Sequence, residues 1–110
     1  MVSDRERIAT NLRKGIVEFC MLSLLGSGRW YGVDLSKRLT SAGLIASEGT
    51  LYPLLSRMRN AGLVETEWVE ADAGRRRRYY ELTDAGRDHL EAFRDVWVPL
   101  SAAVDEFMEA

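Results

Sequence analysis

Four consecutive arginines, Arg75–Arg78, followed by two tyrosines are the most chemically distinctive run in the chain, within the stretch GRRRRYYELTDAG at residues 74–86. Basic side chains that neutralise phosphates release the counterions around a nucleic acid, which supplies affinity independent of sequence. The run therefore indicates phosphate binding. An isolated run of four basic residues fits a solvated charged turn about equally well, so its surroundings in the chain must decide.

The distribution of charge along the chain favours a polyanionic partner. The formal net charge is −2, with 15 Lys and Arg against 17 Asp and Glu. Residues 1–80 hold 13 basic and 9 acidic residues, whereas residues 81–110 hold 2 and 8. A net +4 in the first part and −6 in the last indicates that only the first part faces a polyanion such as DNA.

Other kinds of chemistry have little support in the sequence. Cys20 is the only cysteine and His89 the only histidine, so one chain cannot build a disulfide or a Cys/His metal cluster. The carboxylates are scattered, and the sequence has no glycine-rich phosphate loop. We therefore expect no enzymatic activity, no cofactor and no metal.

Length and composition are those of one globular domain of 110 residues, 46% hydrophobic and 29% charged. The longest apolar stretch, residues 16–26, contains Glu18 and falls short of the roughly 20 residues that span a bilayer. The first 15 residues are charged and lack the apolar segment of a secretory signal. We expect a cytoplasmic protein without a membrane segment.

Three helices are predicted before the arginine run. The first covers about residues 12–25, and after Lys14 only Glu18 and Ser23 are polar, so other elements must cover both of its sides. Residues 26–32 read as a turn. The second helix is shorter and runs from Val33 to Gly43.

The third predicted helix begins after Ser47, a preferred N-cap residue, and ends at Gly62. Its buried face is predicted from the i, i+3, i+4, i+7 spacing of four apolar residues, Leu51, Leu54, Leu55 and Met58. The opposite face starts with the small residues Gly49 and Thr50, which allow close approach to DNA. Pro53 removes one intrahelical hydrogen bond, so we expect a bend there or a loose first turn.

Two short strands, residues 63–69 and 75–83, are joined by a polar turn and predict a hairpin with the arginines at its tip and on its returning strand. Tyr80 and Leu82 fall on one strand face and are expected to pack beneath the hairpin. Three helices followed by a basic hairpin is the order of a winged helix-turn-helix, an α+β fold in which the third helix enters the major groove and the hairpin follows the phosphates. We assign residues 1–82 to this domain.

Several motifs resemble those of the PadR family of bacterial transcriptional regulators: LRKGIVEFCMLSLL, YGVDL, SEGTLYPLLSRMRNAGLV and GRRRRYYELTDAG. The resemblance covers about Leu12 to Leu90, and the single helix after the hairpin is similar to the compact PadR subfamily. It implies a dimeric repressor. The DNA-binding residues that it implies are Tyr31, Ser47, Gly49, Thr50, Tyr52, Arg57, Arg75, Arg76, Arg77 and Arg78.

The last segment, residues 83–110, indicates a dimerisation helix independently of the resemblance. Thr83 and Asp84 mark its start, and Pro99 is expected to bend or split it. Its apolar residues are spaced 3, 4, 3, 4, 3 as in a heptad seam: Leu90, Phe93, Trp97, Leu100, Val104 and Phe107. A second copy of the chain supplies the partner that such a seam needs, while an intramolecular core helix is the alternative.

Trp97 has two interpretations that are compatible with each other. In the compact PadR subfamily, a tryptophan at the matching place lines an apolar pore between subunits that takes flat aromatic compounds. A large aromatic residue in a seam is equally suited to an interface core. The candidate neighbours of Trp97 in an effector site are Leu12, Phe19 and Cys20 on the first helix.

We therefore expect a homodimeric repressor that binds a palindromic operator in double-stranded DNA and is released by a small hydrophobic or aromatic effector. The alternative is a winged-helix module that binds another protein without touching DNA, because fold does not fix function. Four consecutive arginines favour DNA, since a protein-binding module has no need of them.

Overall fold

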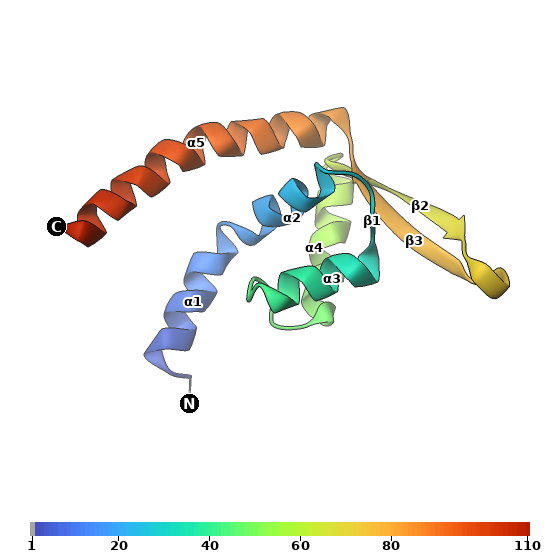
Figure 1. Ribbon diagram of the computed structural model, residues 1–110, viewed down its shortest axis with the longest axis horizontal. Helices are drawn as coiled ribbons and strands as arrows, with labels where there is room; N and C mark the ends of the chain where they lie inside the picture. The colour runs from blue at the N-terminus through green and yellow to red at the C-terminus, as the bar shows by residue number, and fades with distance from the viewer. Residues whose placement is uncertain (1) are drawn as a thin grey trace.

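The computed structural model describes residues 2–110 as a winged helix from which one long helix extends (Figure 1). In chain order the elements are α1 (Asp4–Lys14), α2 (Val17–Leu25), β1 (Trp30–Tyr31), α3 (Gly32–Ser41), α4 (Glu48–Asn60), β2 (Val64–Glu70), the 3-10 turn η1 (Asp72–Gly74), β3 (Arg76–Leu82) and α5 (Asp84–Glu109). The predicted α+β winged helix-turn-helix class is confirmed, although four helices rather than three precede the hairpin. None of the helices within residues 2–110 combines the length and apolar character needed to cross a membrane.

The N-terminal helical region is divided in two, so the prediction of one helix over residues 12–25 is wrong. Ser3 caps α1 by accepting a hydrogen bond from the Glu6 N–H at 3.1 Å, and the two residues have the Ser-x-x-Glu spacing of a capping box. Helix α1 ends at Gly15, and Ile16 has a φ of −123° before α2 begins. Glycine has low helix propensity, which explains why the break falls at this point.

The hydrophobic core lies where α2, α3 and α4 meet one face of the sheet. Fully buried side chains from α2 and α3 include Met21, Leu22, Leu25 and Leu35. The four α4 residues predicted to be buried, Leu51, Leu54, Leu55 and Met58, are all in the core. Four further α2 residues, Val17, Phe19, Cys20 and Leu24, are partly buried against the core. Because α3, β3 and α5 all contact α2, this apolar helix is covered on more than one side as predicted.

Helix α4 is continuous from Glu48 to Asn60 with Pro53 inside it. Ser47 is its N-cap residue as predicted, but the Ser47 side chain makes no capping hydrogen bond. At the other end the Leu63 N–H donates to the Met58 carbonyl and the Gly62 N–H to the Arg59 carbonyl, both at 3.0 Å. This is a Schellman motif, which requires the left-handed φ of +77° at Gly62.

The sheet has three strands in the order β1-β3-β2, all antiparallel. The predicted hairpin is confirmed, with a register from Val64 opposite Leu82 to Glu70 opposite Arg76. Strand β1 was expected to be part of a turn; instead Trp30 pairs with Tyr80, and the Trp30 indole N–H donates to the Leu24 carbonyl at 2.9 Å. Two residues are too few to show the alternation from which strands are predicted.

A corner formed by Gly62, Leu63, Thr83 and Gly86 joins α4, the hairpin and α5. The Thr83 N–H donates to the Leu63 carbonyl at 3.1 Å, and the Thr83 hydroxyl donates to the Gly62 carbonyl at 2.6 Å. The same hydroxyl oxygen accepts a hydrogen bond from the Gly86 N–H at 3.0 Å, which caps α5 as the sequence predicted. Gly86 is buried directly against the Leu63 carbonyl.

Helix α5 leaves this corner and runs to the C-terminus as one gently curved helix, so Pro99 does not split it (Figure 1). Only its first turns pack on the domain. Of the predicted seam residues Leu90 is buried and Phe93 is half-buried, whereas Trp97 is 40% exposed and Phe107 is 80% exposed. The seam therefore does not form an intramolecular core in the single chain.

The packing of Gly86 against the Leu63 carbonyl can be tested by its effect on the free energy of unfolding. A methyl group in Gly86→Ala would overlap the Leu63 carbonyl oxygen, so this change should destabilise the protein by at least the roughly 1–3 kcal/mol typical of overpacking. Gly49→Ala is the matched control because Gly49 is also in the first turn of a helix, and a Cβ there would meet only the Ser47 hydroxyl at an ordinary contact distance of 3.8 Å. It should be neutral or stabilise by up to about 1 kcal/mol. Urea denaturation of both variants measures the difference, and equal stabilities would contradict the tight packing of Gly86 on Leu63.

Candidate nucleic-acid interface

The exposed face of α4 presents small and uncharged side chains along its centre. Gly49, Pro53, Ser56 and Asn60 recur at helical spacing and are all exposed. The exposed side chain of Ser47 adds a hydroxyl at the helix start. Short side chains let a helix approach a surface closely, as entry into a major groove requires.

Tyr52 lies on the flank of α4 that faces α3 and the sheet. A Cβ atom at Gly32 would lie 3.6 Å from the Tyr52 ring and 3.2 Å from the Tyr80 ring, so both rings pack against the start of α3. Desolvation by burial raises the pKa of Tyr52, and Tyr80, Glu48 and Tyr31 raise it further. The Tyr52 hydroxyl therefore keeps its proton at neutral pH and remains a hydrogen-bond donor.

Arg57 and Thr50 lie on the opposite flank of α4, beside α1 and α2. The Arg57 Nε atom is 4.0 Å from a carboxylate oxygen of Glu18 on α2. The Arg57 side chain remains 68% exposed, so its charge is accessible to a ligand from solvent.

One face of the hairpin carries Trp68 between two arginines. The guanidinium carbons of Arg76 and Arg78 lie 5.3 Å and 5.6 Å from the centre of the Trp68 ring, within the range of cation–π contacts. Arg78 is fixed further because its Nε–H donates to the Thr66 hydroxyl at 2.8 Å. We call Trp68, Arg76 and Arg78 the front face of the wing.

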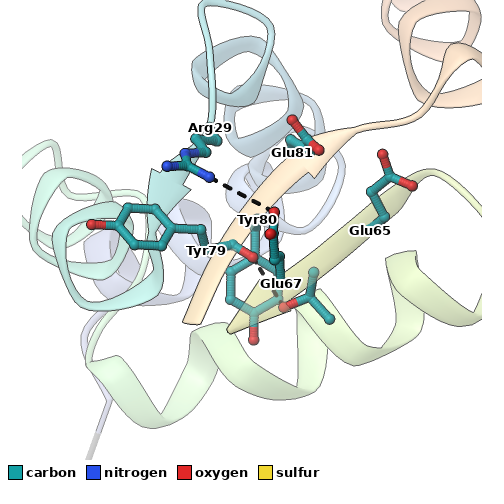
Figure 2. Close-up of a pocket in the computed structure, with 7 residues that line it drawn as sticks. Arg29, Glu65, Glu67, Tyr79, Tyr80 and Glu81 are labelled. Atoms are coloured by element: carbon teal, nitrogen blue, oxygen red, sulfur yellow. Dashed lines mark hydrogen bonds and ion pairs between the residues drawn. The ribbon is translucent and has the colours of Figure 1, made fainter. Parts of the chain in front are cut away.

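The front face continues the core-facing side of the sheet. Side chains at alternate strand positions share a face, so Arg76 and Arg78 lie on the side of β3 that carries Tyr80. Tyr80 and Leu82 are buried beneath the wing as predicted. Figure 2 shows Tyr80 extending from β3 toward the helices. The front face therefore opens on the same side of the sheet as α4.

The opposite face of the sheet, the back face, is largely acidic (Figure 2). Glu65 lies directly across from Glu81 in the register, and Glu67 is 3.7 Å from the Arg29 guanidinium. Arg77 points to this side, where its guanidinium carbon is 4.9 Å from the centre of the Tyr31 ring. Neighbouring arginines of β3 thus face opposite sides of the sheet, and this separates Arg77 from Arg76 and Arg78.

Trp68 did not appear among the predicted interface residues. It is 53% exposed although it is a large aromatic residue. The available signal was its place in the strand, because alternation puts Trp68 on the same side of its strand as the polar residues Thr66 and Glu70. Only the strand register establishes that it lies opposite Arg78.

The predicted effector residues are only partly brought together. Phe19 and Trp97 line an apolar groove of about 480 Å³ between α2 and α5. Phe93 stacks between them, with ring centres 4.0 Å from Phe19 and 5.7 Å from Trp97. Leu12 does not line this groove, and Cys20 lines a different cavity beside α3. Burial raises the pKa of the Cys20 thiol, which keeps it protonated.

Comparison with known proteins identifies the family of this winged helix. A family model described as the transcriptional regulator PadR-like family matches residues 21–92, from α2 through the wing into α5. The chain belongs to the PadR-like family of transcriptional regulators. The resemblance seen in the sequence motifs is confirmed.

Solved structures of PadR-like regulators match this chain over nearly its whole length. A PadR-like transcriptional regulator from Bacillus cereus is 35% identical with a TM-score of 0.83, over 91% of this chain and 98% of its own. A PadR family transcriptional regulator from Eggerthella lenta is 32% identical with a TM-score of 0.79, over 94% and 91% of the two chains. A transcriptional regulator of Mycobacterium tuberculosis is 44% identical over 60 residues, which are 54% of this chain and 55% of the relative.

Membership of this family assigns the PadR-like protein to DNA-binding transcription regulation, and the family consists of regulators rather than enzymes. The exposed face of α4 and the front face of the wing are its candidate contacts with DNA.

The two wing faces predict different roles for the arginines. Arg76→Gln together with Arg78→Gln should make the slope of log K against log salt shallower by about 1.8 per chain, at roughly 0.9 for each phosphate that is no longer neutralised. Affinity for operator and mixed-sequence duplexes should fall by similar factors, since phosphate contacts position the protein without reading sequence. Arg77→Gln is the matched control and should change the slope by less than half as much. Salt titrations by fluorescence anisotropy measure both slopes, and a change after Arg77→Gln of half that of the double variant or more would contradict the assignment of faces.

Proposed function

We propose that this PadR-like protein is a homodimeric repressor that binds a palindromic operator and is released by a small hydrophobic or aromatic effector. The observation that carries the DNA-binding part is the basic front face of the wing, which opens on the same side of the sheet as the small-residue face of α4. In this arrangement α4 enters the major groove while the front face follows the phosphates. The proposed DNA contacts are Tyr31, Ser47, Gly49, Thr50, Tyr52, Arg57, Arg75, Arg76 and Arg78, whereas Arg77 lies on the back face and is expected to contribute less.

Homodimerisation is supported by an apolar surface that the single chain leaves exposed. On α5 this surface consists of Trp97, Leu100, Val104 and Phe107, and Ile8 and Leu12 on α1 are exposed separately. Contiguous exposed apolar residues on a soluble protein mark an interaction site. We propose that residues 83–110 act as a dimerisation helix for the winged helix of residues 1–82, with the seam of one α5 packed against its partner.

The effector part of the proposal is supported by the groove between α2 and α5. Its aromatic stack of Phe19, Phe93 and Trp97 suits a flat apolar compound, since offset ring stacking adds to area burial. The groove is continuous with the α5 seam. A bound compound would therefore change how two chains pack, and with it the separation of their α4 helices.

The dimer prediction concerns the seam. Trp97→Ala and Leu100→Ala should each weaken the dimer by about 2–5 kcal/mol, the usual cost of truncating a large buried apolar side chain. Val98→Ala is the control because Val98 is also exposed but lies off the seam, and it should leave the dimer unchanged. Sedimentation equilibrium measures the dissociation constants. A wild-type monomer at micromolar concentration would refute the proposal.

The operator prediction concerns symmetry. Duplexes selected from a random pool should contain two inverted half-sites whose centres are about one turn of DNA, roughly 34 Å, apart. Because Thr50 and Tyr52 lie on α4, Thr50→Val and Tyr52→Phe should change the preferred bases within each half-site but not their spacing. Footprinting that shows protection without dyad symmetry would contradict the docking of two α4 helices.

A further inference from the structure

A second cavity lies between α1, the start of α2, the loop before α4 and one flank of α4. Its volume is about 440 Å³, within the range of small-molecule sites. It is lined by Thr10, Arg13, Lys14, Val17, Leu44, Ile45, Ala46, Thr50, Pro53, Leu54 and Arg57. We infer that this cavity binds an amphipathic organic anion, a compound with one carboxylate, sulfonate or phosphate group on a hydrocarbon body.

The apolar part of the ligand is specified by the lining from α2, α4 and the loop between α3 and α4. Ile45 and Leu54 belong to the buried core, and Val17 and Leu44 pack against it. Side chains that the core already holds in place offer a preformed apolar surface. A hydrocarbon group placed there would gain roughly 25 cal/mol for each Å² removed from water.

The anionic group is specified by three cations at the same cavity. Arg13 and Lys14 come from the last turn of α1, and Arg57 comes from α4. Glu18 is 4.0 Å from Arg57, but no ion pair within residues 2–110 involves Arg13 or Lys14. Positive charge thus exceeds negative charge here, and charge-assisted hydrogen bonds to an anion are among the stronger polar contacts.

The combination favours a small amphipathic molecule over DNA as the occupant. A phosphodiester backbone would use the three cations but gain nothing from Val17, Leu44 and Leu54. The cavity also differs from the groove between α2 and α5, whose lining includes no lysine or arginine. The two sites therefore suit ligands of different charge.

Occupancy of this cavity would be coupled to DNA binding, and this part of the inference rests on the proposed function. Thr50 and Arg57 line the cavity and are also proposed DNA contacts. An anion beside Arg57 would neutralise charge that a DNA phosphate otherwise meets. Each ligand should then weaken the other by the same factor, because coupling between two binding sites is reciprocal.

Two fluorescent probes test the site without knowledge of the natural ligand. Anilinonaphthalenesulfonate carries an anionic group, and phenylnaphthylamine has the same rings without it. The sulfonate should bind wild type, and Arg13→Gln with Lys14→Gln should weaken its affinity about tenfold while leaving the neutral probe unchanged. Glutamine has helix propensity close to that of lysine and arginine, and retained binding of the neutral probe shows that the variant is folded. Arg5→Gln with Arg7→Gln removes the same charge from α1 outside the cavity and should have no effect on either probe.

The proposed site would be overturned if both double variants lost affinity for the sulfonate equally, or if Arg13→Gln with Lys14→Gln caused no loss of affinity. The coupling is measured by titrating the sulfonate into a complex of the protein with mixed-sequence duplex DNA at low salt. The sulfonate should weaken DNA binding by the wild type, and it should weaken DNA binding less in the variant with Arg13→Gln and Lys14→Gln. Sulfonate binding with no effect on a bound duplex would overturn the coupling. A wild type that binds the sulfonate but no duplex would refute the proposed function and leave the site standing.

Discussion

The contact between Leu63 and the Thr83–Gly86 turn fixes the relative positions of the three parts that the protein uses. The Leu63 carbonyl accepts a hydrogen bond from Thr83, the Thr83 hydroxyl reaches the Gly62 carbonyl, and Gly86 packs on the same peptide. Helix α4 ends at this point, both strands of the wing have their base there, and α5 starts from it. Because backbone groups make most of the contact, the angle between α4 and α5 depends little on side-chain flexibility. In the proposed dimer, a change in how two α5 helices pack would therefore be transmitted directly to the two α4 helices.

Separation of charge between the two faces of one hairpin explains how an acidic chain presents a basic surface. Arg76 and Arg78 lie around Trp68 on the front face with Glu70 opposite Arg76, whereas Glu65, Glu67 and Glu81 share the back face with Arg77. The cation–π contacts also limit the freedom of two long side chains before any ligand arrives, which reduces the entropic cost of binding. The net charge of the whole chain therefore says little about the field at α4, which is set by a few residues on one side of a strand.

Local patterns predicted much of the fold, and of the two errors one concerns a local helix break and the other depends on distant residues. The face of α4 with Leu51 and Leu55, the hairpin and the Thr83 cap follow from spacing and residue type. The break at Gly15 was missed because the apolar run after it masked the helix that Ser3 starts, and β1 was missed because Trp30 is a strand residue only through its pairing with Tyr80. The candidate sites also divide into features that are visible in the sequence and features that depend on distant residues. The arginine run is visible in the sequence, but the position of Trp68 depends on strand register, and the cavity beside Arg57 joins residues from α1 and α4.

The three tryptophans occupy three separate parts of the molecule, and this gives the protein built-in optical reporters. Trp30 is partly buried with its indole N–H bonded to the Leu24 carbonyl, Trp68 stands on the wing beside two guanidinium groups, and Trp97 stacks on Phe93 in the apolar groove. Indole emission depends on polarity and on nearby charge, so the three environments differ in the property that fluorescence records. Variants that keep a single tryptophan would therefore follow folding, wing occupancy and groove occupancy as independent signals in one protein.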